Sequence, residues 1–502
     1  MPKKLRKLKP MGQYILVLDQ GISGSRAILV DSKGKIITSV ECPLKPVFPK
    51  PGLVEYKPGD ILKSQLNAIK TLFRKIGSKK KQISAIGITN QPSTIILWDK
   101  STGKPVYNAI AYQDTRGADL CRERSVQRDM VRERTGLILS HCYTASKIKW
   151  LLDNIKPARK LLDKGNLVCG TVNTYLIWHL TRGAVFATDH TNAAHTLLFN
   201  IFTKSWDKEL LELFSIPAEI LPPILPTSHD YGEATIEGQT IPIHASIVEH
   251  QSSLIGNSCF EEGDVNINYG KDGFLLINTG RKIFILPGLL TTIAWSNNNN
   301  TTYMLEGSIH GVNHIFEWLR NNLGFISPKD NIDDICKRSG ERVFILPALS
   351  GISSPYWNSN ITTCIFGLKS TTTKNDIVRS AVESIAFLVK DNFNIIERDG
   401  RIQLKKIRAS GEISSMPYLL QFQSDILNMP VYKTQDHDAF DLGAAFLAGL
   451  NSRIWQGLLP VERLVTAKKT FNPKLDEQDT RKLYERWRLT CLYSKEWSKN
   501  FT

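Results

Sequence analysis

Apolar and polar positions follow one another in patterns that predict strands and helices along most of the chain. Two stretches, 14–31 and 265–280, share the same pattern: an apolar run enters a polar turn that carries glycine and leaves as a second apolar run. Each predicts a β-hairpin whose turn can present backbone N–H groups to an anion such as phosphate. Either hairpin alone is also typical of ordinary structure, but their repetition predicts two like domains that face one cleft.

The rest of the chain alternates between strand and helix patterns. Strands are expected at 83–89 and 95–98, and helices at 145–152, 174–180, 376–389 and 441–449. The proline-rich segment 222–226 predicts a loop, and the asparagine run 297–300 predicts a turn between strands. This alternation indicates an α/β fold.

A length of 502 residues suits two domains, each able to bury its own core. We expect the boundary near Glu261-Glu262-Gly263, just ahead of the second hairpin. The first domain would then span 13–261 and the second 262–502. Residues 1–12 carry five of the positive charges and are expected to form a disordered basic tail.

Charge and cysteine usage limit the classes of partner and compartment. The net charge is +16, but outside the tail the excess is spread out and no aromatic residues are interleaved with it, so a solvated basic surface explains it and we expect no nucleic-acid partner. No segment has the length of a membrane span or the layout of a secretory signal, so no membrane partner is expected. The eight cysteines are scattered singly, which favours a reducing cytoplasm.

Several ordered blocks of the chain resemble one family of enzymes. They include Leu18-Asp19-Gln20-Gly21, Thr89-Asn90-Gln91, Lys147-Ile148-Lys149-Trp150, Ser354-Pro355-Tyr356-Trp357, Gln423-Ser424-Asp425 and Leu442-Gly443-Ala444-Ala445. On these residues the chain is similar to the glycerol kinases of the FGGY carbohydrate-kinase family, from about residue 13 onward. The resemblance implies two actin-like (RNase-H-like) α/β domains flanking a central cleft, ATP and Mg²⁺ as cofactors, a small polyol as substrate, and a homo-oligomer.

The resemblance assigns the first hairpin to phosphate and metal. Asp19 takes the place of the metal-associated aspartate, although an aspartate here is also a common turn former. Arg26 matches the basic residue that ends the phosphate turn, and Gly21, Ser23 and Ser25 lie between the two as further nucleotide-binding candidates. Two hydroxyl residues of the family's turn are absent here, because the chain has Ile22 and Gly24.

The second hairpin departs further from the family. Gly270 and Lys271 open a turn in which the family has Gly-Thr-Gly, and Lys271 could bind phosphate, block its approach, or pair with Asp272. Gly411 matches one adenosine-site glycine, but Glu412 follows it where the family has a second glycine. Asn313 aligns with another glycine of the ATP site.

Polyol-binding positions are also altered. Pro92-Ser93 stands where the family uses Arg-Glu to hold two substrate hydroxyls, so a bidentate donor and a carboxylate are lost. Cys142 aligns with a substrate-binding tyrosine, but Tyr143 is adjacent and a shift of one residue would restore it. Tyr112 and Phe274 align with aromatics that cover glycerol, and each is equally suited to a core.

The base is changed as well. Glu249 aligns with the catalytic aspartate, and its extra methylene displaces the carboxylate by about 1.5 Å, which can cost roughly 100-fold in rate. His250 is the alternative base, and it lies beside the polyol position.

Scaffold blocks therefore persist while the cleft positions change together, which favours weak or lost glycerol kinase activity. Three hypotheses follow: an ATP-dependent polyol kinase that forms the 3-phosphate, a pseudokinase that binds or regulates, and a kinase with an altered substrate. Retained binding of Mg-ATP would distinguish both kinases from a scaffold.

Overall fold

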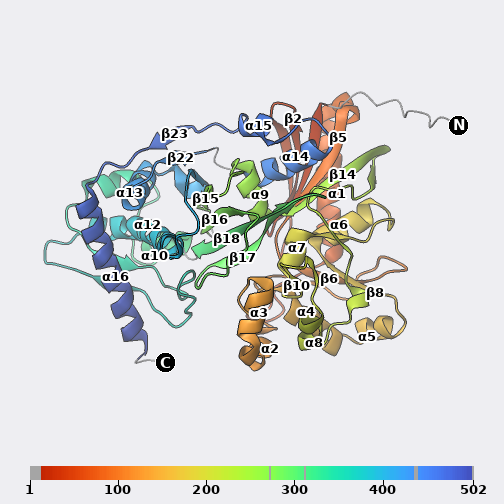
Figure 1. The fold of residues 1–502 in the computed structure, drawn as a ribbon, viewed down its shortest axis with the longest axis horizontal. Helices are drawn as coiled ribbons and strands as arrows, with labels where there is room; N and C mark the ends of the chain where they lie inside the picture. The colour runs from red at the N-terminus through yellow and green to blue at the C-terminus, as the bar shows by residue number, and fades with distance from the viewer. Residues whose placement is uncertain (1–12, 271–272, 310–311, 435–438, 500–502) are drawn as a thin grey trace. The chain divides into compact units, whose positions relative to one another are not determined.

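The computed structural model describes residues 13–270, 273–309, 312–434 and 439–499. The expected basic tail at 1–12 lies outside the described residues, as do Lys271 and Asp272. The chain forms two compact units. The first contains the residues up to Ser258 with Thr292–Tyr303 and Phe440–Leu464, and the second contains Cys259–Thr291, Met304–Ala439 and the residues from Val465 onward (Figure 1).

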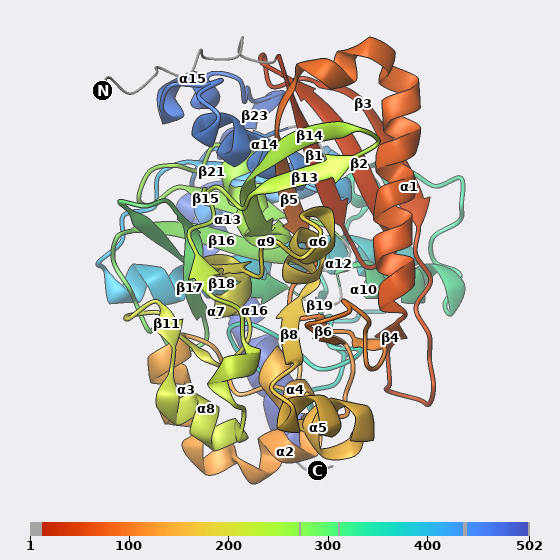
Figure 2. The same cartoon turned by 90° about the vertical axis from the view of Figure 1, so that its right-hand side faces the viewer.

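The first unit is built on a six-stranded sheet. Its strands, in spatial order, are β13 (Glu233–Ile236), β14 (Gln239–Val248), β5 (Ile83–Asn90), β1 (Tyr14–Gln20), β2 (Gly24–Asp31) and β3 (Ile36–Pro43). The strands β1, β2 and β3 are antiparallel, whereas β5 and β14 join β1 in parallel. Helix α1 (Pro58–Ile76) lies along β2 and β3 (Figure 2). Because both faces are covered, β1 is an almost continuous buried run, as its apolar sequence predicts.

The second unit repeats this plan. Its sheet has the order β17 (Leu290–Ser296), β18 (Thr301–Ile309), β16 (Gly273–Gly280), β15 (Val265–Asn268), β21 (Ile407–Ser410), β22 (Val431–Lys433) and β23 (Lys469–Phe471). Residues 292–303, which include most of β17 and the start of β18, are counted with the first unit. An antiparallel hairpin, β15–β16, is again followed in parallel by two strands, β21 and β22. The repeated topology is that of two actin-like (RNase-H-like) α/β units, which confirms the predicted fold class.

A smaller four-stranded sheet completes the first unit, with the order β4 (Glu55–Tyr56), β7 (Ala109–Ile110), β6 (Ile95–Asp99) and β8 (Leu167–Thr171). Short paired strands of this unit are β9 (Thr188–Asp189) with β12 (Ile224–Leu225), and β10 (Phe199–Asn200) with β11 (Ser205–Trp206). Its other helices are α2 (Ala118–Glu123), α3 (Arg128–Thr135), α4 (Thr144–Asn154), α5 (Lys156–Asp163), α6 (Val172–Leu180), α7 (His190–Ala194), α8 (Lys208–Phe214), α9 (Glu249–Gly256), α14 (Ala439–Asn451) and α15 (Leu458–Glu462).

The second unit also contains five α-helices of the described residues and a two-stranded antiparallel sheet. They are α10 (Val312–Asn321), α11 (Ile332–Arg338), α12 (Lys374–Asp399), α13 (Pro417–Leu427) and α16 (Glu477–Lys499), with the strands β19 (Phe344–Leu346) and β20 (Cys364–Phe366). The central helix α12 packs on α11, α13 and β19. Within the described part of the chain, no helix is both long and apolar enough to cross a membrane.

Most predicted elements are present, with two differences in extent. The helix expected at 376–389 runs on to Asp399, because a capping box at Thr373 starts it and the left-handed Gly400 ends it. The loop expected at 222–226 was wrong for Ile224 and Leu225, which pair in parallel with β9. Prolines lack only their own N–H, so the carbonyl of Pro223 still accepts from Thr188 N at 3.0 Å.

Candidate active site

The first hairpin turn, residues 21–23, is tightly braced in the first unit. Gly21 N donates to Gly24 O at 2.9 Å, and the side-chain amides of Gln20 and Gln91 both donate to Gly21 O, at 2.7 and 3.3 Å. A Cβ on Gly24 would lie 2.9 Å from Cys42 O, so only glycine fits against β3 there. The persistence of the Asp-Gln-Gly and Asn-Gln blocks is explained by this bracing.

The two serines of this hairpin face different surroundings. Ser23 is exposed at the turn, where its groups are accessible to a ligand. Ser25 is buried, and its hydroxyl shares a 2.7 Å hydrogen bond with Ser64 of α1. Ser25 therefore ties the hairpin to α1, whereas Ser23 and the half-buried Gly21 remain at its accessible end.

Asp19 and Arg26 lie opposite each other across the β1–β2 ladder. The guanidinium of Arg26 is shared by two carboxylates, because Nη1 is 3.7 Å from Asp19 Oδ2 and 2.8 Å from Asp441 Oδ2. Asp441 is fully buried in the first turn of α14. Sequence reasoning missed Asp441, and its only signal was a charged residue at the start of a small-residue helix.

Close packing of two helices brings Asp441 to this place. A Cβ on Gly443 would lie 1.8 Å from Ser252 O of α9, so α14 and α9 can approach only because position 443 is glycine. The hydroxyl of Ser252 donates to Phe440 O at 2.5 Å, which fixes the start of α14 against α9. The start of α14 and helix α9, which begins at Glu249, are thereby held together.

These carboxylates act on one another electrostatically. Burial and, next, the negative charge of Asp441 raise the pKa of Asp19 well above its usual range, while Arg26 opposes this rise. The charges of Glu249 and Glu41 raise it further. The predicted metal aspartate and the predicted base are therefore near enough in the same unit to influence each other's charge.

Glu249 and His250 occupy the first turn of α9, and both side chains are half-buried. The strand before them is anchored by a buried polar network. Val248 N donates to Thr191 Oγ1 at 3.0 Å, the Thr191 hydroxyl donates to Asp189, and Ser246 also donates to Asp189, at 3.1 Å. The backbone that carries both candidate bases is thus rigidly placed.

Two of the predicted polyol residues of the first unit, Ser93 and Tyr143, lie beside His195, a residue that sequence reasoning missed. The Ser93 hydroxyl is buried and donates to His195 O at 2.9 Å, with Ser93 itself at a positive φ of 58°. The rings of Tyr143 and His195 have centroids 6.4 Å apart. Tyr112 and Cys142 are half-buried, and one lysine joins their carbonyls. Ser93, Tyr143, Tyr112 and Cys142 therefore belong to one local cluster.

In the second unit, Tyr269 and Gly270, which follow β15, pack against the segment after β21. Tyr269 N donates to Ser410 O at 2.8 Å, and Ile413 N donates to Tyr269 O at 3.0 Å. Gly411 has φ 92°, and a Cβ there would lie 2.7 Å from the carbonyl carbon of Tyr269. Gly270 and Gly411, both predicted to bind nucleotide, are therefore brought together by backbone contact.

Three other predicted positions of the second unit have separate surroundings. Phe274 is 4% exposed in β16, opposite Asn268. Glu412 is exposed, directly after Gly411. Asn313 lies in α10, but its side chain is outside the described residues, as is the whole of Lys271.

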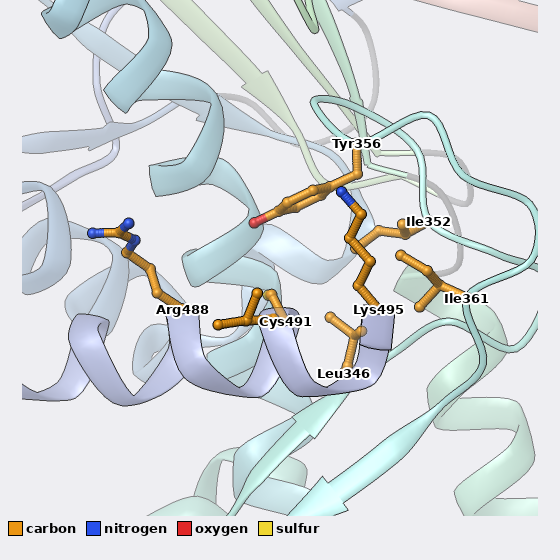
Figure 3. A pocket seen from close by; sticks show the side chains of 8 residues that line it. Leu346, Ile352, Tyr356, Ile361, Arg488, Cys491 and Lys495 are labelled. Atoms are coloured by element: carbon orange, nitrogen blue, oxygen red, sulfur yellow. The ribbon is translucent and has the colours of Figure 1, made fainter. Parts of the chain in front are cut away.

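The second unit also contains a cavity of about 230 Å³ beside α16. Its lining is Leu346, Ile352, Tyr356, Ile361, Arg488, Cys491, Leu492 and Lys495, and Lys495 extends from the helix toward Tyr356 (Figure 3). The Tyr356 hydroxyl donates to Asp391 Oδ2 at 2.9 Å, and Trp357 Nε1 donates to Gly288 O at 2.8 Å. The Ser354–Trp357 block thus makes structural hydrogen bonds inside this unit. None of the predicted site residues lines the cavity.

Comparisons with known proteins agree with this architecture. Residues 14–256 match the N-terminal domain of the FGGY family of carbohydrate kinases, and residues 265–452 match its C-terminal domain. "Glycerol kinase 2" of Thermotoga maritima is 40% identical over 97% of this chain and 100% of its own length. The glycerol kinase of Bacillus subtilis is 39% identical over 95% of this chain and 98% of its own length.

Solved structures are similar as well. The crystal structure of Plasmodium falciparum glycerol kinase with ADP superposes with a TM-score of 0.91 at 33% identity, covering 96% of this chain and 98% of that one. A ligand-bound xylulose kinase from Lactobacillus acidophilus, at 22% identity and a TM-score of 0.87 over 97% of this chain and 100% of that one, shares the fold. The chain therefore belongs to the FGGY family of carbohydrate kinases, and it is glycerol kinase-like over nearly its whole length.

Proposed function

We propose that the protein transfers a phosphoryl group from ATP to a terminal hydroxyl of a small polyol, glycerol or a close relative, to give the 3-phosphate. The observation that carries this proposal is the arrangement of Asp19, Arg26 and Glu249, in which the charge of Glu249 acts on a buried Asp19 beside the first hairpin turn. Phosphoryl transfer depends on charge neutralisation, phosphate binding and a base near the attacking oxygen, and this unit supplies candidates for all three.

The residues present fit Mg-ATP. The carboxylate of Asp19 suits a hydrated divalent cation, and Arg26, which Asp441 also holds, suits a phosphate oxygen. Among the described residues no cluster of three or more His, Cys, Asp or Glu is arranged to hold a metal by itself, so the nucleotide would have to complete the coordination of Mg²⁺. When bound, Mg-ATP supplies the phosphoryl group and neutralises its charge.

The chain's own residues would position the reactants and take the proton. Asp19 would orient the metal's water shell, while Arg26 and the N–H groups near Ser23 would hold phosphate oxygens. In the second unit, Gly270 and Gly411, with Lys271 and Asn313, are proposed for the rest of the nucleotide. Glu249 would accept the proton of the attacking hydroxyl.

The polyol would lie against the cluster around His195. Tyr112 and Tyr143 offer aromatic surfaces there. Phe274, in the second unit, is a candidate for polyol contact from the family resemblance alone. The Ser93 hydroxyl donates to a protein carbonyl, so it offers a polyol its oxygen lone pair. A pocket that has lost the Arg-Glu pair gives fewer directed hydrogen bonds, which allows a substrate other than glycerol.

Variants of the two candidate bases test this proposal. Glu249→Gln keeps the shape of the side chain but removes its basicity, so we expect kcat to fall by at least about 100-fold. His250→Gln is the matched control in the same helical turn, and we expect it to change kcat by less than about 5-fold. The reverse order of effects would make His250 the base, and equal activity of Glu249→Gln and wild type would overturn the proposed chemistry.

A pseudokinase is the second candidate, and it is favoured by the same carboxylates. Arg26 is held by Asp441, and Asp19, Asp441 and Glu249 together oppose the approach of a polyphosphate. Calorimetric titration with Mg-ADP distinguishes the candidates. A kinase binds it in the micromolar to millimolar range, whereas no heat at millimolar nucleotide would favour a scaffold.

We also propose a homo-oligomer in the cytoplasm. The eight cysteines, which all lie within the described residues, form no disulfide, as a reducing compartment would leave them. Assembly rests on the family resemblance, and light scattering of the purified protein measures it directly. A monomer at all concentrations would contradict it.

A further inference from the structure

Lys147, in α4, has an uncommon environment for a lysine. Its side chain is completely buried, and Nζ donates to two backbone carbonyls, Cys142 O at 2.8 Å and Tyr112 O at 3.2 Å. These acceptors are 30 residues apart in sequence, and both belong to positions assigned to the polyol. Lys147 thus joins the two segments through its amine.

Burying the charged amine of Lys147 costs free energy, because the amine loses its hydration. Desolvation lowers the pKa of Lys147 to about 7. The nearby titratable and charged groups are Cys142, Asp114, Arg116, Cys121 and His141. A lysine is among the residues least often buried, and an apolar side chain would fill the same volume without this cost. The amine adds two directed hydrogen bonds, one to the segment that contains Tyr112 and one to the segment that contains Cys142.

The segment that contains Tyr112 is fixed independently on its other side. Arg116 donates to Asp114 Oδ1 at 2.7 Å and to Glu55 Oε1 at 2.6 Å, and its guanidinium lies 4.4 Å from the ring centroid of Trp150. Asp114 Oδ2 in turn accepts from Val54 N at 2.7 Å. This network anchors the segment to β4 and α4. The carbonyl of Tyr112, which accepts from Lys147, therefore belongs to a segment that is already held in place.

The segment that contains Cys142 has a different support. It leads into α4, whose N-cap is Tyr143, and Ala145 N donates to Thr196 O at 3.0 Å beside His195. Lys147, on the first turns of the same helix, folds its side chain back onto the Cys142 carbonyl. The amine therefore sets the distance between the Tyr112 and Cys142 backbones, and with it the spacing of the Tyr112 and Tyr143 side chains.

We propose that Lys147 is a positioning residue of the polyol pocket, which acts by holding the carbonyls of Tyr112 and Cys142 at a fixed separation. This inference rests on the proposed function, because it gives the two segments a polyol to bind. It also gives the Lys147–Trp150 block a role: Lys147 orders the pocket from inside, and Trp150 supports the Arg116 network.

The test separates substrate binding from nucleotide binding. Lys147→Met keeps the length of the side chain but removes both donors, and a displacement of about 1 Å in a pocket can cost roughly 100-fold. We expect the KM for the polyol to rise at least about 10-fold, with the KM for ATP within about 2-fold of wild type. Lys149→Met is the matched control on the same helix, since Lys149 forms a surface ion pair with Asp153 at 2.7 Å. It should leave both constants unchanged.

A second measurement does not depend on turnover. Thermal stabilisation by the polyol alone should be present in wild type and Lys149→Met and absent, at the same polyol concentration, in Lys147→Met. If Lys147→Met does not fold, Lys147→Gln retains two N–H donors and should give an intermediate polyol response. An unchanged polyol KM, or equal changes in both KM values, would overturn the inference.

The failures of the two proposals are distinguishable. A wild-type protein that neither binds nor phosphorylates any polyol contradicts the proposed function, and this inference falls with it. A wild-type protein that responds to polyol beside an equally responsive Lys147→Met variant contradicts the inference alone.

Discussion

At the scale of single residues, charged side chains of the candidate site are paired with or packed against other residues of the site. Arg26 is shared between Asp19 and Asp441, and Lys147 is buried against carbonyls. Each arrangement places an ionisable group where its charge is costly, so each should be visible in binding or in pH dependence.

Asp441→Asn should strengthen nucleotide binding. The substitution keeps the side-chain volume but removes a buried charge that holds Arg26 Nη1 at 2.8 Å. Because that charge also repels phosphate, we expect Mg-ADP to bind roughly 3- to 10-fold more tightly by calorimetry. The control is Asp479→Asn, whose carboxylate is 65% exposed in α16. Weaker binding in Asp441→Asn would mean that Asp441 supports the metal instead of competing for Arg26.

Lys147 should give the protein a stability that rises with pH. Its pKa is about 7 in the folded protein and 10.5 as the unperturbed value, so between these limits the unfolded state binds more protons than the folded state. Unfolding free energy should therefore increase with pH across this window, and the contribution should be lost as pH falls through 7.

Comparison with Lys147→Met isolates this effect from other titrating groups. Between pH 7.5 and 9.5, the unfolding free energy of wild type should increase relative to that of the variant by about 1 kcal/mol per pH unit. Urea titrations at several pH values measure it. Parallel stability curves would show that the amine stays charged when folded.

At the scale of elements, the site depends on two helices that touch through glycine. Helix α14 starts against α9, so the position of Asp441 and the start of α9 at Glu249 are coupled by the contact at Gly443. The braced hairpin turn depends in the same way on Gly24 against β3.

Gly443→Ala should damage both stability and activity. Its Cβ would lie 1.8 Å from the carbonyl oxygen of Ser252, so the two helices must separate. We expect a loss of about 3 kcal/mol in unfolding free energy, together with a lower kcat. Gly59→Ala in α1 is the matched control, because a Cβ there meets nothing within 4 Å, and it should be neutral or stabilising by up to about 1 kcal/mol. Equal stability of both variants would contradict the packing argument.

At the scale of the whole molecule, the sequence predicted the two hairpins, the α/β class and the repeated plan, because apolar periodicity and glycine turns are local signals. It did not predict that residues 292–303 and 440–464 would belong to the first unit. The return of a later segment to an earlier domain depends on long-range packing, which local sequence patterns do not show. For the same reason Asp441 was missed: it is 422 positions from Asp19 in the chain, and the packing of α14 against α9 and against Gly87 of β5 brings the two near. Ser93 and Tyr143 were predicted individually, but His195, which connects them, carries no motif.

Transfer of radiolabel from γ-labelled Mg-ATP to glycerol and related polyols tests directly whether this chain is an active polyol kinase. Wild type and Glu249→Ala, purified identically, should be compared at equal concentration. We expect a labelled polyol phosphate with wild type and at least about 100-fold less with the variant. No labelled product with any polyol, or equal labelling by both proteins as a contaminating kinase would give, would contradict this expectation.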